Sequence, residues 1–448
     1  MTLRPGKRAP TRGGSTILLH RRQPDSFQDA IPNRVNFASS ISGQTAFLRD
    51  MEAIGTSDML TLNMPSRLAA DGDFGEEAAA IQLVGHVGRW ASRLRIARVD
   101  VQAVDLLQRS DVIAEPHQYA ARRLLMGRSV RPSTAPSTIA PRVESAVASS
   151  IRADLASPSG VFTHPNGTMS FMMAFDDERD GLPQALHAGF NVVSEESFGT
   201  IMSTLVGSIG ASSALQNIAG SVSPRWFREQ FSLLLRELYL NGFEHGRRSE
   251  DGRAFARVLR CILARLTMLK YSRIANQDSF TAMMSPFLNR CTQRIVRANK
   301  LTGTRYPDDI PLLEFSVIDN GPGLVRTWLA SEAQRLSGEY RAADLRDVST
   351  DSERAIVERC FQKHQTSKRT ATAGLGLFDV HKIMRRLGAL LIVRTSRVRL
   401  VCDCSKDHGE LATIRFEDWD PKQPELPEIS GTTVTALIPL LPSPWMEA

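Results

Sequence analysis

The sequence predicts an α+β protein in which helices pack against a sheet. Segments with helical spacing of apolar residues alternate with short strand-like runs, and most C-terminal strands follow one another closely along the chain. No apolar run in the 448 residues approaches the roughly 20 that cross a bilayer, so no membrane association is expected. The composition, 42% hydrophobic and 23% charged, is that of a globular protein with buried cores.

In the N-terminal part, composition and periodicity predict a tail followed by a small folded unit. Residues 1–35 are rich in Arg, Pro, Gly and Ser and are expected to be a disordered basic tail. Residues 36–130 combine strand-like Asp58–Met64, helical spacing over Phe74–Leu94 and strand-like Ile96–Val101. They are therefore expected to form an α/β unit, whose role the sequence leaves open.

A compositional boundary separates this unit from the C-terminal half. Residues 131–150 are dense in Pro, Ser, Thr and Ala, which predicts a linker. Residues 151–221 contain a strand-like Thr168–Phe175 and are assigned to neither side. Residues 222–448 are expected to form the second domain.

Residues 222–448 are predicted to contain two principal helices and a series of strands. The first helix follows Ser223-Pro224, and apolar residues from Phe227 to Leu238 recur on one of its faces. The later elements are expected to be a strand over Glu314–Ile318, a helix over Phe378–Leu387, a strand over Leu390–Arg394, a hairpin of Arg397–Cys402 with Leu411–Phe416, and a last strand over Thr432–Ile438.

The first of these helices carries polar groups beside its apolar face. Glu237, Asn241 and Glu244 are spaced by four and three residues, so they are expected to line one stripe at the edge of the core. An Asn oxygen suits magnesium, and a Glu one turn away can accept a proton from a water or hydroxyl nucleophile. For the helix taken alone, a solvated edge with ordinary hydrogen bonds is the alternative interpretation.

Two glycine-containing turns add ligand-binding features. Asp319 follows a strand and offers an acceptor for an amino group, while Gly321 and Gly323 let a flat ligand approach the backbone. Gly374 to Leu377 precedes a helix whose N-terminal amides can hold phosphate oxygens. Each turn alone is a weak signal, and the second lacks the Gly-Lys-Ser/Thr of the Walker pattern.

Taken in order, these motifs resemble the nucleotide-binding boxes of the GHKL ATPase superfamily. That superfamily includes DNA gyrase, heat-shock chaperone ATPases, histidine kinases, MutL-type mismatch-repair proteins and the anti-sigma-factor serine kinases. The matching segments are Glu237-x-x-x-Asn241, Asp319-Asn-Gly321-Pro-Gly323, Gly374-Leu-Gly376-Leu377 and Gly431-Thr432-Thr433. The resemblance covers roughly residues 222 to 440.

The resemblance implies a Bergerat fold, a mixed sheet backed by helices, that binds ATP and Mg²⁺ beneath a lid at 324–373. It implies that Asn241 binds the magnesium, that Asp319 accepts from the adenine amino group, and that Glu237 is the catalytic base. The other implied ATP contacts are Gly321 and Gly323 at the adenine, Thr432 behind Asp319, Lys368 in the lid, and Gly374, Leu375, Gly376 and Leu377 around the phosphates. For Lys368, a solvated surface lysine is the alternative.

Departures from the family pattern leave three functions open. Glu244 stands where histidine kinases usually have a basic residue, whereas His245-Gly246 resembles the anti-sigma serine kinases. We therefore expect an ATPase whose conformational cycle is read by the N-terminal region or by a partner protein. A protein serine/threonine kinase of the anti-sigma type and a nucleotide-gated binding module with negligible catalysis are the alternatives.

The spacing between the motifs indicates an insertion. Residues 247–300 are expected to be inserted helices, because Phe255, Val258, Leu259, Ile262 and Leu266 recur at helical spacing. Such an insertion offers room for a partner site, and a protein partner or a second copy of the chain is expected.

Charge and cysteine content add weaker expectations. The formal net charge of +7 permits nucleic acid as a partner, but the basic residues are scattered and do not indicate it. Five scattered cysteines fit a reducing cytoplasm. Cys402, Cys404 and His408 form a local cluster without an obvious fourth zinc ligand, so reduced thiols are favoured over a metal site.

Overall fold

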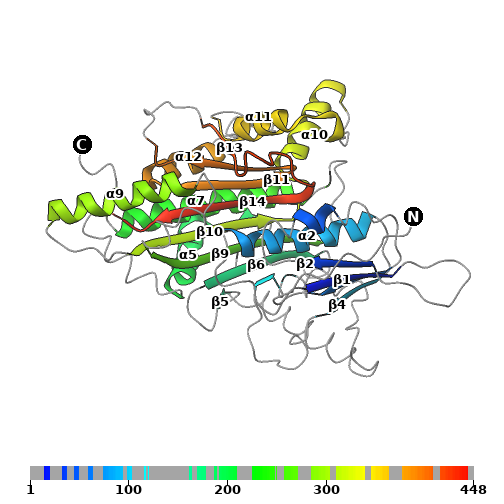
Figure 1. The fold of residues 1–448 in the computed structure, drawn as a ribbon, viewed down its shortest axis with the longest axis horizontal. Coiled ribbons are helices and arrows are strands. Elements are labelled where there is room, and N and C mark those ends of the chain that lie inside the picture. Colours follow the sequence, from blue (N-terminus) through cyan, green and yellow to red (C-terminus); the bar gives the residue numbers. More distant parts are fainter. Residues whose placement is uncertain are drawn as a thin grey trace, which may run out of the picture.

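The fold is an α+β arrangement of one large and one smaller sheet with flanking helices (Figure 1). In this computed structural model the described residues are 15–20, 33–37, 45–49, 59–63, 74–93, 98–102, 116–117, 120, 161–163, 169–177, 186–188, 191–208, 224–247, 249, 257–270, 284–302, 309–338, 345–362, 376–406 and 414–441. None of the helices in these ranges combines the length and apolarity needed to cross a bilayer.

The large sheet has eight strands in the order β13-β12-β11-β14-β10-β9-β6-β5. Its strands are β5 Val161–Thr163, β6 Met169–Asp177, β9 Arg257–Lys270, β10 Asp309–Asp319, β11 Leu390–Ser396, β12 Val398–Asp403, β13 Glu417–Asp418 and β14 Ile429–Pro439. Every ladder between these described strands is antiparallel. The expectation of a mixed sheet is therefore wrong for the strands that the structure describes.

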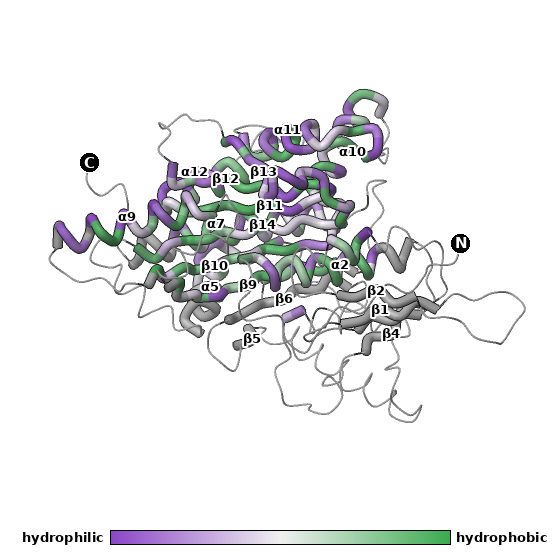
Figure 2. The backbone as a smooth tube through the Cα atoms, viewed as in Figure 1, coloured by the Kyte–Doolittle hydropathy of each residue, from purple (hydrophilic) through white to green (hydrophobic). Residues whose placement is uncertain are grey.

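Helices cover both faces of this sheet, as the alternation along β10 shows. Leu313 and Phe315 pack into one apolar cluster with α7 (Pro224–Gly246) and α12 (Gly376–Leu387). Leu312 packs into a second cluster with α9 (Met284–Thr302). Since successive side chains of a strand point to opposite faces, the sheet forms the middle of three layers. Figure 2 shows hydrophobic residues along these strands.

Strand β9 corrects the expectation of a helical insertion over 247–300. Arg257–Lys270 is a strand that pairs with β10 on one side and β6 on the other, and the helix of this region is α9. All seven residues from Val258 to Ala264 are buried. A strand covered on both faces is apolar at nearly every position, so its residues also match a helical pattern.

The smaller sheet has the strand order β2-β1-β3-β4. Its strands are β1 Ser15–His20, β2 Asn33–Phe37, β3 Met59–Asn63 and β4 Arg98–Gln102. The expected strands and helix of the α/β unit are confirmed by β3, α2 (Glu76–Arg93) and β4, and β3 and β4 are parallel, as a helical crossover permits. The expected disorder of residues 1–35 is wrong for β1 and the start of β2, because β1 pairs with the distant β3, which composition does not reveal.

Helix α2 also packs against the large sheet. Gln82 Oε1 accepts a hydrogen bond from Thr433 Oγ1 on β14 at 2.8 Å, and Gln82 Nε2 donates to the carbonyl of Arg394 on β11. The expected linker at 131–150 lies outside the described residues, and the proposed domain boundaries stay predictions. The structure does place an N-terminal helix on the C-terminal sheet. The remaining elements before α7 are β7 His187–Ala188, β8 Asn191–Val192 and α5 Glu195–Ser208.

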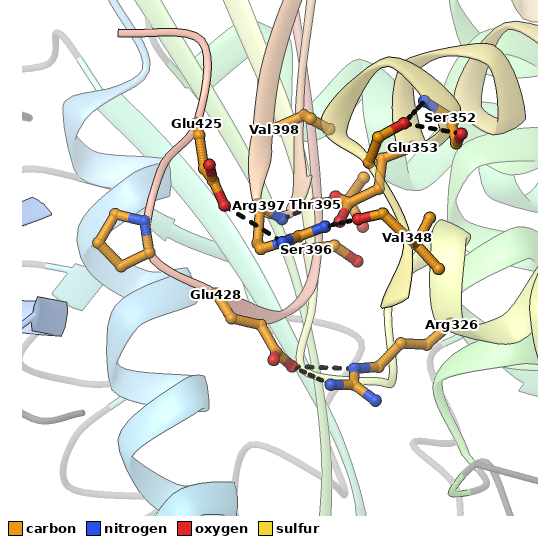
Figure 3. A network of polar contacts seen from close by, with 12 residues as sticks. Arg326, Val348, Ser352, Glu353, Thr395, Ser396, Arg397, Val398, Glu425 and Glu428 are labelled. Atoms are coloured by element: carbon orange, nitrogen blue, oxygen red, sulfur yellow. Dashed lines mark hydrogen bonds and ion pairs between the residues drawn. The ribbon is translucent and has the colours of Figure 1, made fainter. Parts of the chain in front are cut away.

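The segment expected to be a lid is helical where it is described. It contains α10 Leu324–Ser337, the 3-10 turn Leu345–Asp347 and α11 Thr350–Cys360. Arg397, between β11 and β12, donates to the Glu353 carboxylate of α11 at 2.7 Å, and Arg326 of α10 pairs with Glu428 at 2.6 Å (Figure 3). These ion pairs fasten 324–360 to the sheet, while 363–373 lies outside the described residues.

The predicted strand Thr168–Phe175 is confirmed by β6, and other predicted elements of the C-terminal half are confirmed by α7, β10, α12, β11, β12 and β14. The expected strand Leu411–Phe416 is wrong over 414–416, which lie outside any strand; 411–413 are not among the described residues. The partner of β12 is instead the two-residue β13. Burial of Ile414 and Phe416 explains the apolar pattern without a strand.

Candidate functional site

Five of the residues expected to contact ATP line one hollow. It lies between α7, α12, the end of β10 and the start of β14. The five are Asn241, Asp319, Gly323, Leu377 and Thr432, and the lining is completed by Leu238, Gly242, His245, Val317, Leu324, Thr327 and Val434.

A second hollow, of about 530 Å³, lies between α2 and the other face of the sheet. Its polar side chains are already bonded within the protein: Arg394 donates to the carbonyls of Ser396 and Pro427, and Gln82 bonds Thr433. None of the expected site residues lines it. We interpret it as part of the packing between α2 and the sheet.

The acceptor at the centre of the first hollow is Asp319, the last residue of β10. Asp319 Oδ1 accepts from the Gly321 amide at 2.7 Å, and the carboxylate also accepts from the Thr432 amide. Burial raises the pKa of Asp319 from 3.8 to about 6, although these hydrogen bonds and the charges of Arg89 and Arg260 oppose the rise. At neutral pH the side chain is therefore an ionised acceptor held in a fixed orientation.

Glycines allow three backbone segments to close around Asp319. A Cβ on Gly321 would lie 2.5 Å from the Cα of Gly246, and a Cβ on Gly431 would lie 2.0 Å from the Asp319 carbonyl oxygen. Gly323 has a φ of 90°, and its missing Cβ leaves space for Thr395. Gly321 thus packs behind Asp319 and does not line the hollow, whereas Gly323 does.

Glu237 and Asn241 meet the beginning of α12. Asn241 Nδ2 donates to the Glu237 carbonyl at 2.9 Å, which leaves Oδ1 as the atom for a cation. A Cβ on Gly376 would lie 2.7 Å from Glu237 Oε2 and 3.6 Å from Asn241 Nδ2, so only glycine fits there without displacing the carboxylate. A carboxylate beside a helix N-terminus is electrostatically favourable.

The expected stripe of three polar residues on α7 divides in the structure. Asn241 lines the hollow, whereas Glu244 is exposed at the surface and does not line it. One residue further on, His245 lines the hollow, and burial lowers the pKa of His245 to about 4. The ring is therefore neutral at physiological pH. His245 stands four residues after Asn241, about one helical turn along the same face of α7, and this spacing is the signal by which the sequence indicates that both line the hollow.

Arg260 of β9 is a neighbour of the site that the sequence did not reveal. Its buried guanidinium lies 4.6 Å from the ring centroid of Tyr239 and 4.7 Å from that of Phe243, both on α7. Its charge helps to keep Asp319 ionised. Because 247–300 was expected to be helical, the pairing of Arg260 with Asp319 across β9 and β10 was not foreseen.

Helix α2 reaches the back of the site. Arg89 Nη1 donates to the carbonyl of Asn320 at 3.0 Å, and a Cβ on Gly85 would lie 2.8 Å from the Asn320 Cβ. His86 Nδ1 accepts from the amide of Ser430 at 2.9 Å. The turn after Asp319 and the turn before Thr432 are thus both held by a helix more than 200 residues away in the sequence.

The residues present fit a magnesium nucleotide. The hollow provides an ionised acceptor in Asp319, a neutral oxygen in Asn241 and, at the start of α12, Leu377. Magnesium is commonly held by few protein oxygens together with the substrate phosphates. The expected contacts Lys368, Gly374 and Leu375 lie outside the described residues.

Comparison of the chain with protein-family models, with curated proteins and with solved structures finds no match. Support for a function therefore comes from the geometry of the hollow and from the motifs that line it.

Proposed function

We propose that the protein is an ATPase of the GHKL superfamily that binds Mg-ATP in this hollow within a Bergerat-type fold. The observation that supports it best is the convergence of four separated motifs. Asn241, Asp319, Leu377 and Thr432 lie in different segments, yet all four line the same hollow. Glu237 does not line it, but its carboxylate lies beside Gly376, the residue before Leu377. Each motif is weak alone, but their arrangement around one space is the one that the resemblance requires.

The proposal assigns a chemical task to each residue. The Asp319 carboxylate accepts a hydrogen bond from the adenine amino group, and the start of α12 holds phosphate oxygens. Asn241 Oδ1 helps to hold Mg²⁺, which when bound neutralises phosphate charge during hydrolysis. Glu237 accepts a proton from the attacking water.

The contacts of α2 support a route from the site to the N-terminal region. Arg89 and Gly85 both touch Asn320, the residue next to Asp319. A ligand that shifts the Asp319 turn therefore changes a surface on which α2 is packed. We propose that this helix reports the nucleotide state to the N-terminal unit or to a partner protein.

Glu237→Ala tests the catalytic assignment. The variant is expected to bind ATP with nearly unchanged affinity in calorimetry but to release phosphate about 10²- to 10⁴-fold more slowly, as is typical when a general base is removed. Glu244→Ala is the matched control, because Glu244 lies on the same helix and is exposed. Turnover at the normal rate in Glu237→Ala, or equal losses in both variants, contradicts the assignment.

One observation favours a second function, a protein serine/threonine kinase of the anti-sigma type. His245, part of the motif that resembles those kinases, lines the hollow, and Gly246 packs against Gly321. In that case Glu237 takes the proton from a partner's hydroxyl. ATP labelled at the γ-phosphate distinguishes the two: label on a candidate partner supports the kinase, and free labelled phosphate supports the ATPase. ATP binding with neither product indicates a nucleotide-gated binding module.

A further inference from the structure

A second cluster of reactive side chains lies between α12 and β12. Its members are His381, Cys402 and Cys404, whose ligand atoms all lie within 4.8 Å of one another. All three side chains are buried. The sequence pairs the two cysteines with His408, which is outside the described residues, whereas the fold brings His381 to them from another element.

The spacing of the two sulfurs matches that of ligands on one tetrahedral ion. The Sγ atoms of Cys402 and Cys404 are 3.8 Å apart. Zn–S bonds of about 2.3 Å at a tetrahedral angle place two sulfurs about 3.8 Å apart, whereas a disulfide needs about 2.0 Å. The imidazole of His381 lies within the same radius, so small side-chain rotations bring all three ligands onto one centre.

Hydrogen-bond donors and positive charges surround the two sulfurs. The thiol of Cys404 donates to the sulfur of Cys402, and the Arg415 amide donates to the same sulfur. Positive charges are contributed by Lys406 near Cys402 and by Arg385 near Cys404. Amide and cationic neighbours of this kind stabilise thiolates and orient metal ligands.

We propose that His381, Cys402 and Cys404 bind one Zn²⁺ ion, with a fourth position for water. Two thiolates and an imidazole select a soft or borderline ion and disfavour Mg²⁺, Ca²⁺ and Mn²⁺. On binding, the two thiols release their protons, so two thiolates balance the charge of the ion. Neutral imidazole adds no charge, which makes the buried complex electrically neutral.

The ion connects α12 to the sheet beside the nucleotide site. His381 stands one helical turn after Leu377, which lines the hollow, and Cys402 is the next-to-last residue of β12, which pairs with β11. The amide of Cys404 donates to the Ala389 carbonyl, which fixes the turn that carries the second sulfur. Zinc at this point fastens the helix whose first residues face Glu237.

Metal analysis of the full-length protein, produced without a histidine tag, tests the proposal. Inductively coupled plasma mass spectrometry is expected to find about one zinc per chain in the wild type, and much less in His381→Ala, Cys402→Ser and Cys404→Ser. Cys360→Ser is the matched control, because Cys360 is a lone cysteine on α11 and is expected to retain zinc. Zinc retained by all the variants overturns the ligand assignment, and copper in its place overturns the choice of metal.

A second measurement needs no variant and guards against misfolded ones. Co²⁺ titrated into metal-free wild-type protein is expected to give thiolate-to-cobalt charge transfer in the near ultraviolet and the visible bands of tetrahedral cobalt. Added Zn²⁺ should remove both signals. A wild type that contains no zinc and shows no cobalt spectrum refutes the site and leaves three buried side chains that only pack. Neither measurement involves nucleotide, so the result is independent of the ATPase proposal.

Discussion

Replacing Asp319 by Asn is expected to stabilise the fold while it abolishes nucleotide binding. Burial raises the pKa of the Asp319 carboxyl group to about 6, because the loss of solvation destabilises its charge. The hydrogen bonds to the carboxylate and the nearby arginines stabilise that charge, but to a smaller extent. An amide of the same shape keeps an acceptor oxygen for the Gly321 amide but carries no charge. The ionised Asp319 therefore offers a ligand a hydrogen-bond acceptor but lowers the stability of the fold, a combination that is common at functional sites.

The size of the effect follows from the pKa. A rise from 3.8 to about 6, at about 1.4 kcal/mol per pKa unit, means that the ionised carboxylate lowers the free energy of unfolding by about 3 kcal/mol. The folded state keeps the proton between pH 3.8 and about 6 while the unfolded state loses it. The stability that Asp319 contributes is thus fully present below pH 3.8 and lost as the pH rises through about 6.

Urea denaturation of the wild type and of Asp319→Asn between pH 4 and pH 8 measures this directly. The free energy of unfolding of the variant minus that of the wild type should increase between about pH 4 and pH 6 and level off above about pH 6.5. The total increase should be at most about 3 kcal/mol. Other titrating groups contribute equally to both proteins and cancel in the difference. Asp347→Asn, the same substitution at an exposed carboxylate outside the hollow, is the control variant. A stability difference between Asp319→Asn and the wild type that does not change with pH refutes the reasoning. Undiminished ATP binding by the variant refutes it as well.

Two further predictions concern the backbone and a buried ion pair. Gly338→Ala should cost about 1–2 kcal/mol, the usual penalty for a left-handed residue, because nothing lies within 4 Å of its Cβ. Gly431 has a similar φ, but a Cβ there would lie 2.0 Å from the Asp319 carbonyl oxygen, so urea denaturation should show a clearly larger loss of stability for Gly431→Ala. Equal losses in the two variants would mean that the backbone moves apart at little cost. Arg397→Ala leaves the fully buried Glu353 carboxylate without its cation and should cost about 3 kcal/mol in thermal unfolding, whereas Arg335→Ala, in an exposed pair, should cost under about 1 kcal/mol. A small loss in Arg397→Ala would indicate that Glu353 becomes protonated at little cost.

The sequence predicted those parts of the fold whose signal is local. Helices α2, α7 and α12 bury one face against the sheet, so their apolar residues repeat at helical spacing and reveal both type and extent. Strand β9 buries both faces and therefore shows no alternation, which is why it was mistaken for helix. Strand β1 is defined by its pairing with β3, and no local feature of either segment specifies that partner.

The same distinction applies to the candidate site. Asn241, Asp319 and Thr432 belong to short motifs that resemble those of the GHKL superfamily, so the resemblance grouped them without knowledge of the fold, and all three line the same hollow. Arg260 acts on Asp319 only because β9 lies beside β10, and His381 meets two cysteines only because α12 packs on the hairpin. Such contacts join residues with no common motif, and only the tertiary structure shows them.

Close packing around Asn320 makes the site and the N-terminal helix parts of one mechanical unit. Asn320 Oδ1 accepts from the Leu259 amide at 2.8 Å, its carbonyl accepts from Arg89, and its Cβ abuts Gly85. The neighbouring Asp319 is enclosed by glycines whose Cβ positions are already occupied. A densely packed region of this kind has little compressible space, so we expect a displacement on the side of the hollow to reach α2 and β9 together. If the proposed function holds, the hydrogen bonds that fix this turn are therefore the contacts through which a nucleotide would act on α2.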